Sequence, residues 1–126
     1  MRSLAREAVY KYIYSKLFNQ DEGLLAVLIK ELNEVDKEFA LAIYDGVVEK
    51  ENIYLSTLEK LAERYNLNRI LLSDRCAILV AMAELDKFPD TPKPVVIDEA
   101  VKIARKYSTE KSTDFVNGIL AQYIKG

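Results

Sequence analysis

Four side chains that could bind nucleic acid follow one another at every fourth position near the start of the chain. They are Arg6, Tyr10, Tyr14 and Phe18, and a helix would place them along a single edge. A guanidinium and aromatic rings in such a row form a platform on which unpaired RNA bases stack, at about 1–3 kcal/mol per base. The alternative is that the rings only widen a buried face. Burial is the favoured interpretation for Tyr10 and Phe18, whereas Tyr14 can keep its hydroxyl in water.

The residues that most enzymes use for catalysis are missing from this sequence. It contains no His, which excludes imidazole acid–base steps, His-based triads and His-ligated metals. The single Cys76 is flanked by apolar residues, which favours a buried thiol over a nucleophile. Asp98 and Glu99 are adjacent in a predicted helix and point to different sides, so they cannot act as a pair. The sequence also lacks a glycine-rich phosphate loop and a metal-ligand cluster. We therefore expect no enzymatic activity, no cofactor and no bound metal.

Charge is distributed unevenly along the chain. The formal net charge is −2, whereas nucleic-acid binders are usually basic. Residues 1–16 and 102–111 are basic, and residues 21–51 carry nine acidic side chains against three lysines. Two basic ends can form a local positive face under a negative total. The competing interpretation is a solvated helical surface on which the charges cluster by chance, and charge alone favours it.

Apolar side chains recur at helical spacing throughout the chain, and no sustained alternation indicates a strand. The pattern predicts an all-α protein of about seven helices. Their approximate ranges are 3–18, 21–34, 36–50, 52–65, 74–88, 95–107 and from 112 to near the end. Residues 76–83 are apolar on every side of the fifth helix, which predicts that this helix is the buried centre of the fold.

Local signals mark several helix ends and one close contact. Asp36, Ser73 and Ser112 carry side-chain oxygens that could accept hydrogen bonds from the first turn of a helix. Gly46, inside the third predicted helix, lowers helix propensity, and such a glycine usually lets another helix approach closely. All three prolines lie in residues 89–94, which predicts a loop before the sixth helix. Together these signals predict a helical bundle.

No segment of the chain has the pattern of a targeting signal or a membrane span. Charged residues near the start interrupt the apolar stretch that a signal peptide needs. The longest apolar run, residues 76–83, is far shorter than the roughly 20 residues that cross a membrane. A lone cysteine agrees with a reducing compartment. We therefore expect a cytoplasmic protein with no membrane association.

The last third of the chain carries a motif of a known family. Residues 96–101 read VIDEAV, residues 103–107 read IARKY, residues 109–112 read TEKS and residues 115–120 read FVNGIL. Further matches, in the same order as in the family, are Ala5-Arg6-Glu7, Tyr14-Ser15, Asp74-Arg75 and Glu84-Leu85. The sequence resembles the NusB family over essentially its whole length, although residues 19–65 match mainly in pattern.

This resemblance implies a bacterial transcription antitermination factor. Members of the family bind the boxA element of ribosomal RNA leader transcripts as a heterodimer with NusE, a protein of the small ribosomal subunit. The heterodimer joins an RNA polymerase antitermination complex. The implied fold is a single NusB-like RNA-binding domain over residues 1–126, built from two packed helical subdomains. The N-terminal subdomain covers about 1–50 and the C-terminal one about 51–126.

The resemblance also implies which residues face RNA. The family's RNA surface combines a basic N-terminal arm, a tyrosine of the first helix, the start of the central helix and the turn that leads into the FVNG motif. The positions of this sequence that match are Arg2, Arg6, Tyr14, Asp74, Lys111 and Phe115.

Several residues depart from the family pattern at this surface. Relatives begin with several consecutive arginines, whereas this chain has only Arg2 and Arg6. Asp114 stands where a lysine commonly precedes the phenylalanine, and Ser108 replaces the usual glycine. Fewer cations mean fewer phosphate contacts, although Lys111 adds a charge where relatives often carry an acidic or neutral residue. We expect RNA binding to be weak for the chain alone and stronger with NusE.

Two other functions fit the same fold. Ribosomal RNA cytosine methyltransferases carry an RNA-targeting domain of this kind, although we expect a chain of 126 residues to leave no room for the methyltransferase domain. A protein-only helical adaptor that has lost RNA binding would agree with the thin basic arm. An RNA-binding assay with and without NusE separates these functions from antitermination.

Overall fold

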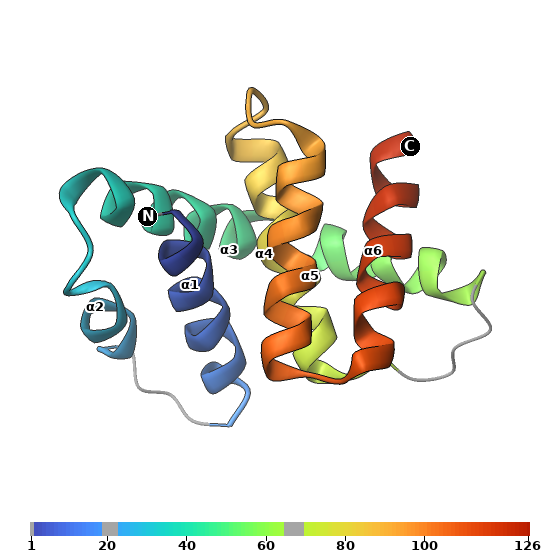
Figure 1. The fold of residues 1–126 in the computed structure, drawn as a ribbon, viewed down its shortest axis with the longest axis horizontal. Coiled ribbons are helices and arrows are strands. Elements are labelled where there is room, and N and C mark those ends of the chain that lie inside the picture. Colours follow the sequence, from blue (N-terminus) through green and yellow to red (C-terminus); the bar gives the residue numbers. More distant parts are fainter. Residues whose placement is uncertain (1, 19–22, 65–69) are drawn as a thin grey trace.

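The structure is a computed structural model that describes residues 2–18, 23–64 and 70–126. Six helices make up this part of the chain: α1 (Arg2–Lys16), α2 (Leu24–Ile29), α3 (Glu34–Glu63), α4 (Leu72–Lys87), α5 (Lys93–Tyr107) and α6 (Glu110–Lys125). The described residues form no strand (Figure 1). The prediction of an all-α fold with about seven helices is confirmed. Two predicted helices are joined in α3, and parts of the predicted helices 21–34 and 52–65 lie outside the described residues.

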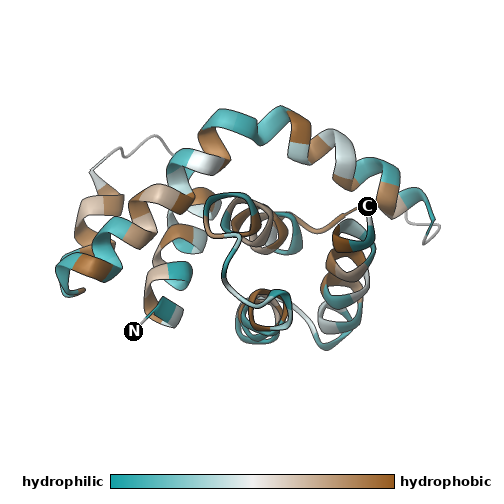
Figure 2. Cartoon of the chain, turned by 90° about the horizontal axis from the view of Figure 1, so that it is seen from above, coloured by the Kyte–Doolittle hydropathy of each residue, from teal (hydrophilic) through white to brown (hydrophobic). Residues whose placement is uncertain are grey.

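The longest helix, α3, has a kink where the sequence predicts a break. Its 30 residues cover the third predicted helix and most of the fourth, and Lys50 leaves the helical region with φ −125° and ψ 17°. Residues 49–52 contain neither proline nor glycine, so nothing in the sequence ends the helix there. The chain therefore bends and continues as a helix. Figure 2 shows this bent helix running across one side of the molecule.

The centre of the fold is α4, which contacts α1, α3, α5 and α6. Every residue from Cys76 to Glu84 is buried, which confirms the prediction of a buried central helix. Apolar side chains from all six helices join in one core. Because this core continues past residue 50, the division into two subdomains stays a prediction.

Gly46 lies at a close contact between α3 and α4. A Cβ atom at this position would lie 3.2 Å from the Cβ of Ala83 and 3.3 Å from the side chain of Lys87. The glycine and the alanine together let two helix backbones come near each other. The prediction that Gly46 permits a close helix contact is confirmed.

Three predicted helix caps are wrong. Asn33, rather than Asp36, caps α3, and its Oδ1 accepts a hydrogen bond from the Asp36 N–H at 2.8 Å. Thr109 caps α6, and Ser112 completes the capping box from the third helical position. No side chain caps α4, which begins after Leu71. A capping oxygen reaches an N–H two or three residues after it, so a residue already inside the first turn cannot cap its own helix. The predicted cap at Ser73 fails for the same reason.

One end of the molecule gathers the ends of four helices. Figure 1 shows the C-terminal ends of α1 and α5 and the N-terminal ends of α4 and α6 along its lower edge. The short connection between α5 and α6 turns the chain at this end. Among the described residues, none of the helices is both long and apolar enough to span a membrane.

Candidate nucleic-acid interface

A groove lies between the start of α4 and the start of α6. It encloses about 380 Å³, and its walls are Ile70, Leu71, Asp74, Thr109, Lys111, Ser112 and Phe115. Three of the six predicted RNA-facing residues, Asp74, Lys111 and Phe115, therefore meet at one place. The walls are mostly apolar, with one ammonium group at the edge. Such a lining suits an aromatic base that carries a negatively charged phosphate group.

Two residues of α6 give the groove its aromatic ring and its positive charge. Lys111 and Phe115 are four residues apart, so the helix places them on one face. Lys111 is exposed, whereas Phe115 is half-buried and packs against the core. One part of the Phe115 ring thus belongs to the core, and another part lines the groove.

The third predicted residue in the groove, Asp74, is only 4% exposed. Its Oδ1 accepts a hydrogen bond from the Ser108 hydroxyl at 2.7 Å, and its Oδ2 accepts one from the Ser112 hydroxyl at 2.9 Å. The Ser73 hydroxyl lies 2.8 Å from that of Ser108, and the Thr109 hydroxyl lies 3.0 Å from that of Ser112. We call Asp74 and these four residues the hydroxyl cluster. Three members of the cluster, Asp74, Thr109 and Ser112, supply polar groups to the wall of the groove.

An aromatic row leads from α1 to the end of α5. The ring centroid of Tyr14 lies 6.2 Å from that of Tyr10 and 5.3 Å from that of Phe18. Tyr10 in turn stacks on Tyr107, with a centroid distance of 5.3 Å. Tyr10 is buried, as predicted, and Tyr14 is half-buried. Tyr107 directly precedes Ser108, so the row ends beside a residue of the hydroxyl cluster in the sequence.

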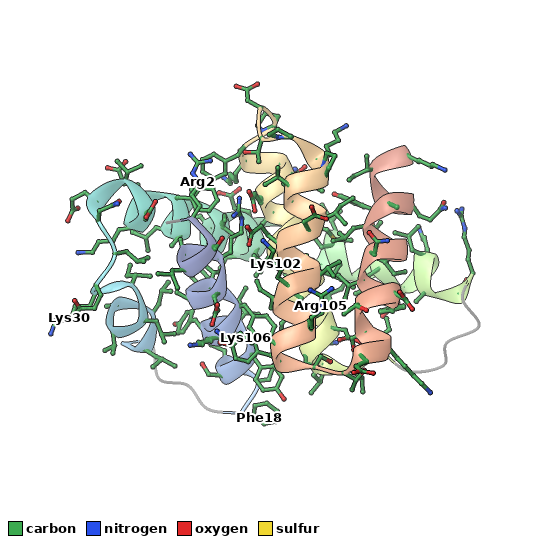
Figure 3. The ribbon with its side chains drawn as sticks, viewed as in Figure 1. Arg2, Phe18, Lys30, Lys102, Arg105 and Lys106 are labelled. Atoms are coloured by element: carbon green, nitrogen blue, oxygen red, sulfur yellow. The ribbon has the colours of Figure 1, made fainter. Side chains whose placement is uncertain are left out.

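The predicted burial of Phe18 is wrong, because this ring is 65% exposed. It lies in the turn after α1, beyond the last residue of the helix that packs on the core. Figure 3 shows Phe18 at the lower edge of the molecule, at the end where α4 and α6 begin. The row therefore presents one open ring, Phe18, and one half-open ring, Tyr14.

Arg6, one of the predicted RNA contacts, does not face solvent in this structure. It is 4% exposed, and its Nε and Nη2 donate to the two carboxylate oxygens of Glu84, both at 2.6 Å. Glu84 is 1% exposed, and a carboxylate buried so deeply requires a charged partner. Glu99 adds a second carboxylate 3.7 Å from Nη1. The Arg6 guanidinium thus forms its ion pairs inside the protein.

The other arginine of the predicted arm, Arg2, lies at the far end of α1. A rise of about 1.5 Å per residue puts it about 18 Å along the helix from Tyr14. Its guanidinium lies 4.5 Å from the ring centroid of Phe39 and 5.6 Å from that of Phe88. In Figure 3, Arg2 and Phe18 lie at opposite edges of the molecule. The structure does not bring Arg2 to the groove.

A strip of basic side chains follows the exposed face of α5. Lys102, Arg105 and Lys106 form it, and all three are labelled in Figure 3. Lys106 donates to a Glu7 carboxylate oxygen at 2.8 Å, and the Tyr107 hydroxyl donates to the same oxygen. Burial alone would raise the pKa of Glu7, but the hydrogen bonds from Lys106 and Tyr107 outweigh it and hold the pKa below the ordinary 4.5. Sequence reasoning found this basic segment but missed the carboxylate that faces it.

The thiol of Cys76 is fully buried, as predicted. Burial raises its pKa to about 12, so the thiol stays protonated at neutral pH. In residues 2–18, 23–64 and 70–126, no three Cys, Asp or Glu side chains form a group that could hold a metal ion.

Sequence reasoning also missed the roles of Ser108 and Thr109. One local signal was available, because Thr109 and Ser112 have the spacing of a capping box at the start of an apolar helical pattern. No local signal indicates that Ser108 bonds to Asp74, since the two residues are 34 positions apart.

Comparisons with known proteins agree with this fold. The transcription antitermination protein NusB of Acetivibrio thermocellus is 34% identical over 128 residues, which cover 98% of this chain and 88% of the relative. That of Leptospira biflexa is 33% identical over 96 residues, covering 76% and 69%. Among solved structures, T. maritima NusB matches with a TM-score of 0.89 and 32% identity, covering 99% of this chain and 91% of that one.

A second solved structure contains the antitermination factors NusB and NusE in complex with double-stranded RNA. It matches with a TM-score of 0.84 and 27% identity, and the match covers 98% of this chain and 96% of that one. A protein-family model described as the NusB family matches residues 1–125. Since this match spans nearly the whole sequence, the chain belongs to the NusB family.

Proposed function

We propose that this protein is a transcription antitermination factor that binds RNA together with NusE. The observation that carries the proposal is the groove with Lys111 and Phe115, together with the aromatic row that ends in Tyr14 and Phe18. Its relatives are named transcription antitermination proteins, and one similar structure joins NusB, NusE and RNA. The proposed RNA is the boxA element of ribosomal RNA transcripts, and the proposed outcome is processive transcription of ribosomal RNA operons.

In this proposal the rings bind bases and the lysines bind phosphates. Phe115 and Tyr14 each stack on an unpaired base, and Lys111 contacts the backbone beside the groove. A strand that leaves the groove along α5 meets Lys106 and then Arg105 and Lys102. Arg2 remains a proposed phosphate contact for a strand that extends along α1.

The work of the protein is binding, and we propose no reaction for it. NusE and RNA would recruit it to an RNA polymerase antitermination complex, which places it in the cytoplasm. The groove supports this assignment because Phe115 offers a surface for stacking and Lys111 offers a positive charge.

A titration of RNA tests the proposed function. The probe is a labelled boxA RNA, offered as a single strand and as a duplex with its complement, with and without purified NusE. We expect weak binding of the single strand to the protein alone and tighter binding with NusE, and a scrambled RNA of equal length serves as the control. Binding to NusE without any binding of RNA would contradict the proposal and favour a protein-only adaptor.

A further inference from the structure

The number of protons fixes the direction of the hydrogen bonds in the hydroxyl cluster. A hydroxyl carries one hydrogen, and Ser108 and Ser112 each give theirs to an oxygen of Asp74. With both hydrogens used, the Ser108 and Ser112 oxygens accept from Ser73 and Thr109, and the 2.9 Å contact between Ser108 and Ser112 themselves has no hydrogen left to share. All four hydroxyls are thus polarised toward one carboxylate. Hydrogen bonds to an ionised acceptor are roughly twice as strong as neutral ones.

The hydroxyl cluster connects three segments of the chain. Asp74 belongs to the first turn of α4, Ser108 follows the last residue of α5, and Ser112 belongs to the first turn of α6. The same first turn of α6 carries Lys111, and Phe115 follows one turn later on the same face. Whatever holds this turn in place also sets the position of Lys111 and Phe115 in the groove.

The Asp74 carboxylate is poorly accessible to a ligand. Both of its oxygens already accept hydrogen bonds, and 96% of the residue's surface is covered, since its exposed fraction is 4%. A base that approached the groove would meet Phe115 and Lys111 before it met Asp74, because these two are half-buried and exposed, respectively.

We propose that Asp74 is a positioning residue, which fixes the start of α6 and so preorganises Lys111 and Phe115, and that its carboxylate does not contact an RNA base. This inference rests on the proposed RNA-binding function. Preorganisation favours binding because less conformational freedom is lost when the RNA arrives.

The first test compares Asp74→Ala, Ser108→Ala and the double variant in RNA titrations with NusE present. We expect each single change to weaken RNA binding at least threefold. The double variant should bind as weakly as Asp74→Ala alone, since Ser108 acts through Asp74. The salt dependence of binding should stay as in the wild type, because no phosphate contact is removed. Additive losses in the double variant would overturn the proposal.

Asp74→Asn separates positioning from direct contact without emptying the site. The amide has nearly the shape of the carboxylate, and it can accept from Ser108 and donate to Ser112. We expect this variant to bind RNA within twofold of the wild type. If it keeps native hydrogen exchange but binds RNA at least tenfold more weakly, Asp74 reads the RNA directly and the proposal is wrong.

Hydrogen exchange of the free protein gives a measurement that does not depend on RNA. In Asp74→Ala and Ser108→Ala, amides of residues 113–117 should exchange faster, while those of residues 119–124 keep their rates. Thr113→Ala is the matched control, because it removes a hydroxyl from the same turn that bonds to the Glu110 carbonyl instead. Its exchange and its RNA affinity should not change.

The two proposals can fail separately. Unchanged exchange over residues 113–117 in both alanine variants would show that Asp74 does not hold α6. Wild-type protein that binds no RNA with NusE would defeat the proposed function, and the exchange rates would still decide whether Asp74 anchors the helix.

Discussion

Single residues in this protein differ in role even where their positions in the sequence look alike. Arg2 and Arg6 are both basic residues of α1, yet one is exposed and the other is paired with Glu84 inside the protein. Phe115 and Tyr14 are intermediate, since each packs against the core and keeps part of its ring open. These residues give the first two predictions.

Arg6→Ala should strongly destabilise the protein. The change leaves the Glu84 carboxylate buried without its partner, which costs about 3–5 kcal/mol. Urea denaturation at pH 7 measures the loss, and Arg2→Ala on the same helix is the control, with a much smaller expected effect. Replacing the pair together, as Arg6→Met with Glu84→Leu, should recover most of the stability. A single variant as stable as the wild type would show that Glu84 finds another partner.

Phe115→Ala should weaken RNA binding by roughly 1–3 kcal/mol, the contribution of one stacked base. Because the ring is only half-buried, the loss of stability should stay below the 3–5 kcal/mol that truncation of a fully buried phenylalanine costs. Tyr14→Ala should likewise weaken RNA binding by roughly 1–3 kcal/mol, measured by RNA titrations with NusE present.

Lys111→Ala provides the contrast to the aromatic variants. It should weaken RNA binding modestly and flatten the salt dependence by about one charge. A Phe115→Ala protein that melts far lower, yet binds RNA normally while folded, would make Phe115 a core residue only.

At the scale of elements, the helices are held in place by a few contacts between residues far apart in the sequence. Gly46 and Ala83 let α3 approach α4, and Glu7 joins α1 to the end of α5 through Lys106 and Tyr107. The contact at Gly46 depends on the small size of two side chains, so a larger side chain should disturb it. The contact at Glu7 depends on the charge of a carboxylate, so a change of pH should disturb it.

Gly46→Leu should destabilise the protein by about 1–3 kcal/mol, as overpacking of a tight contact does. Even a Cβ at this position meets the Cβ of Ala83 at 3.2 Å, and that atom can move only with the backbone of α4. Thermal melting compares this variant with Asp45→Leu, a change at the neighbouring exposed position of α3. Equal melting temperatures for the two variants would mean that α3 can shift away from α4 at little cost.

The contact of Glu7 should make the stability depend on pH. The pKa of Glu7 is lowered in the folded protein, so its contribution is present above the unfolded value near 4.5 and is lost as the pH falls through the folded value. Glu7→Gln should therefore lower the stability at pH 7, and the difference from the wild type should shrink below pH 4.5.

Denaturation curves at several pH values measure this difference. Glu59→Gln, an exposed change on α3, is the control. A difference between wild type and Glu7→Gln that stays constant down to pH 3 would show that the carboxylate charge does not stabilise the contact.

At the scale of the whole molecule, a protein with a net charge of −2 presents its proposed RNA surface at one end. The groove, the aromatic row and the near end of the basic strip belong to helix ends of α1, α4, α5 and α6, which lie along the same edge of the molecule (Figure 1). With so few cations near the groove, the chain alone offers little long-range attraction to RNA. The proposed partner NusE would add the missing affinity.

RNA and NusE should therefore strengthen each other's binding by the same factor, as thermodynamic linkage requires. The affinity of NusE for this protein is measured by calorimetry with and without boxA RNA, and the affinity of RNA with and without NusE. We expect both ratios to exceed one and to agree. Equal RNA affinity with and without NusE would refute the coupling.

The sequence by itself determined the fold class, the buried central helix and the family. Helical periodicity is a local property, and the stretch from Cys76 to Ala83 is apolar on every side, so both can be read without knowing the neighbours. The close contact at Gly46 was predictable for a similar reason, since a glycine inside a helix usually has a packing role.

Only the tertiary structure decided which polar side chains face inward. Arg6 is buried because its partner Glu84, 78 positions away, is brought beside it by the packing of α1 on α4. Asp74 is enclosed because Ser108 and Ser112 reach it from the turn between α5 and α6. The free energy of burying a charge depends on which partners surround it, and those partners come from segments that the local pattern cannot connect.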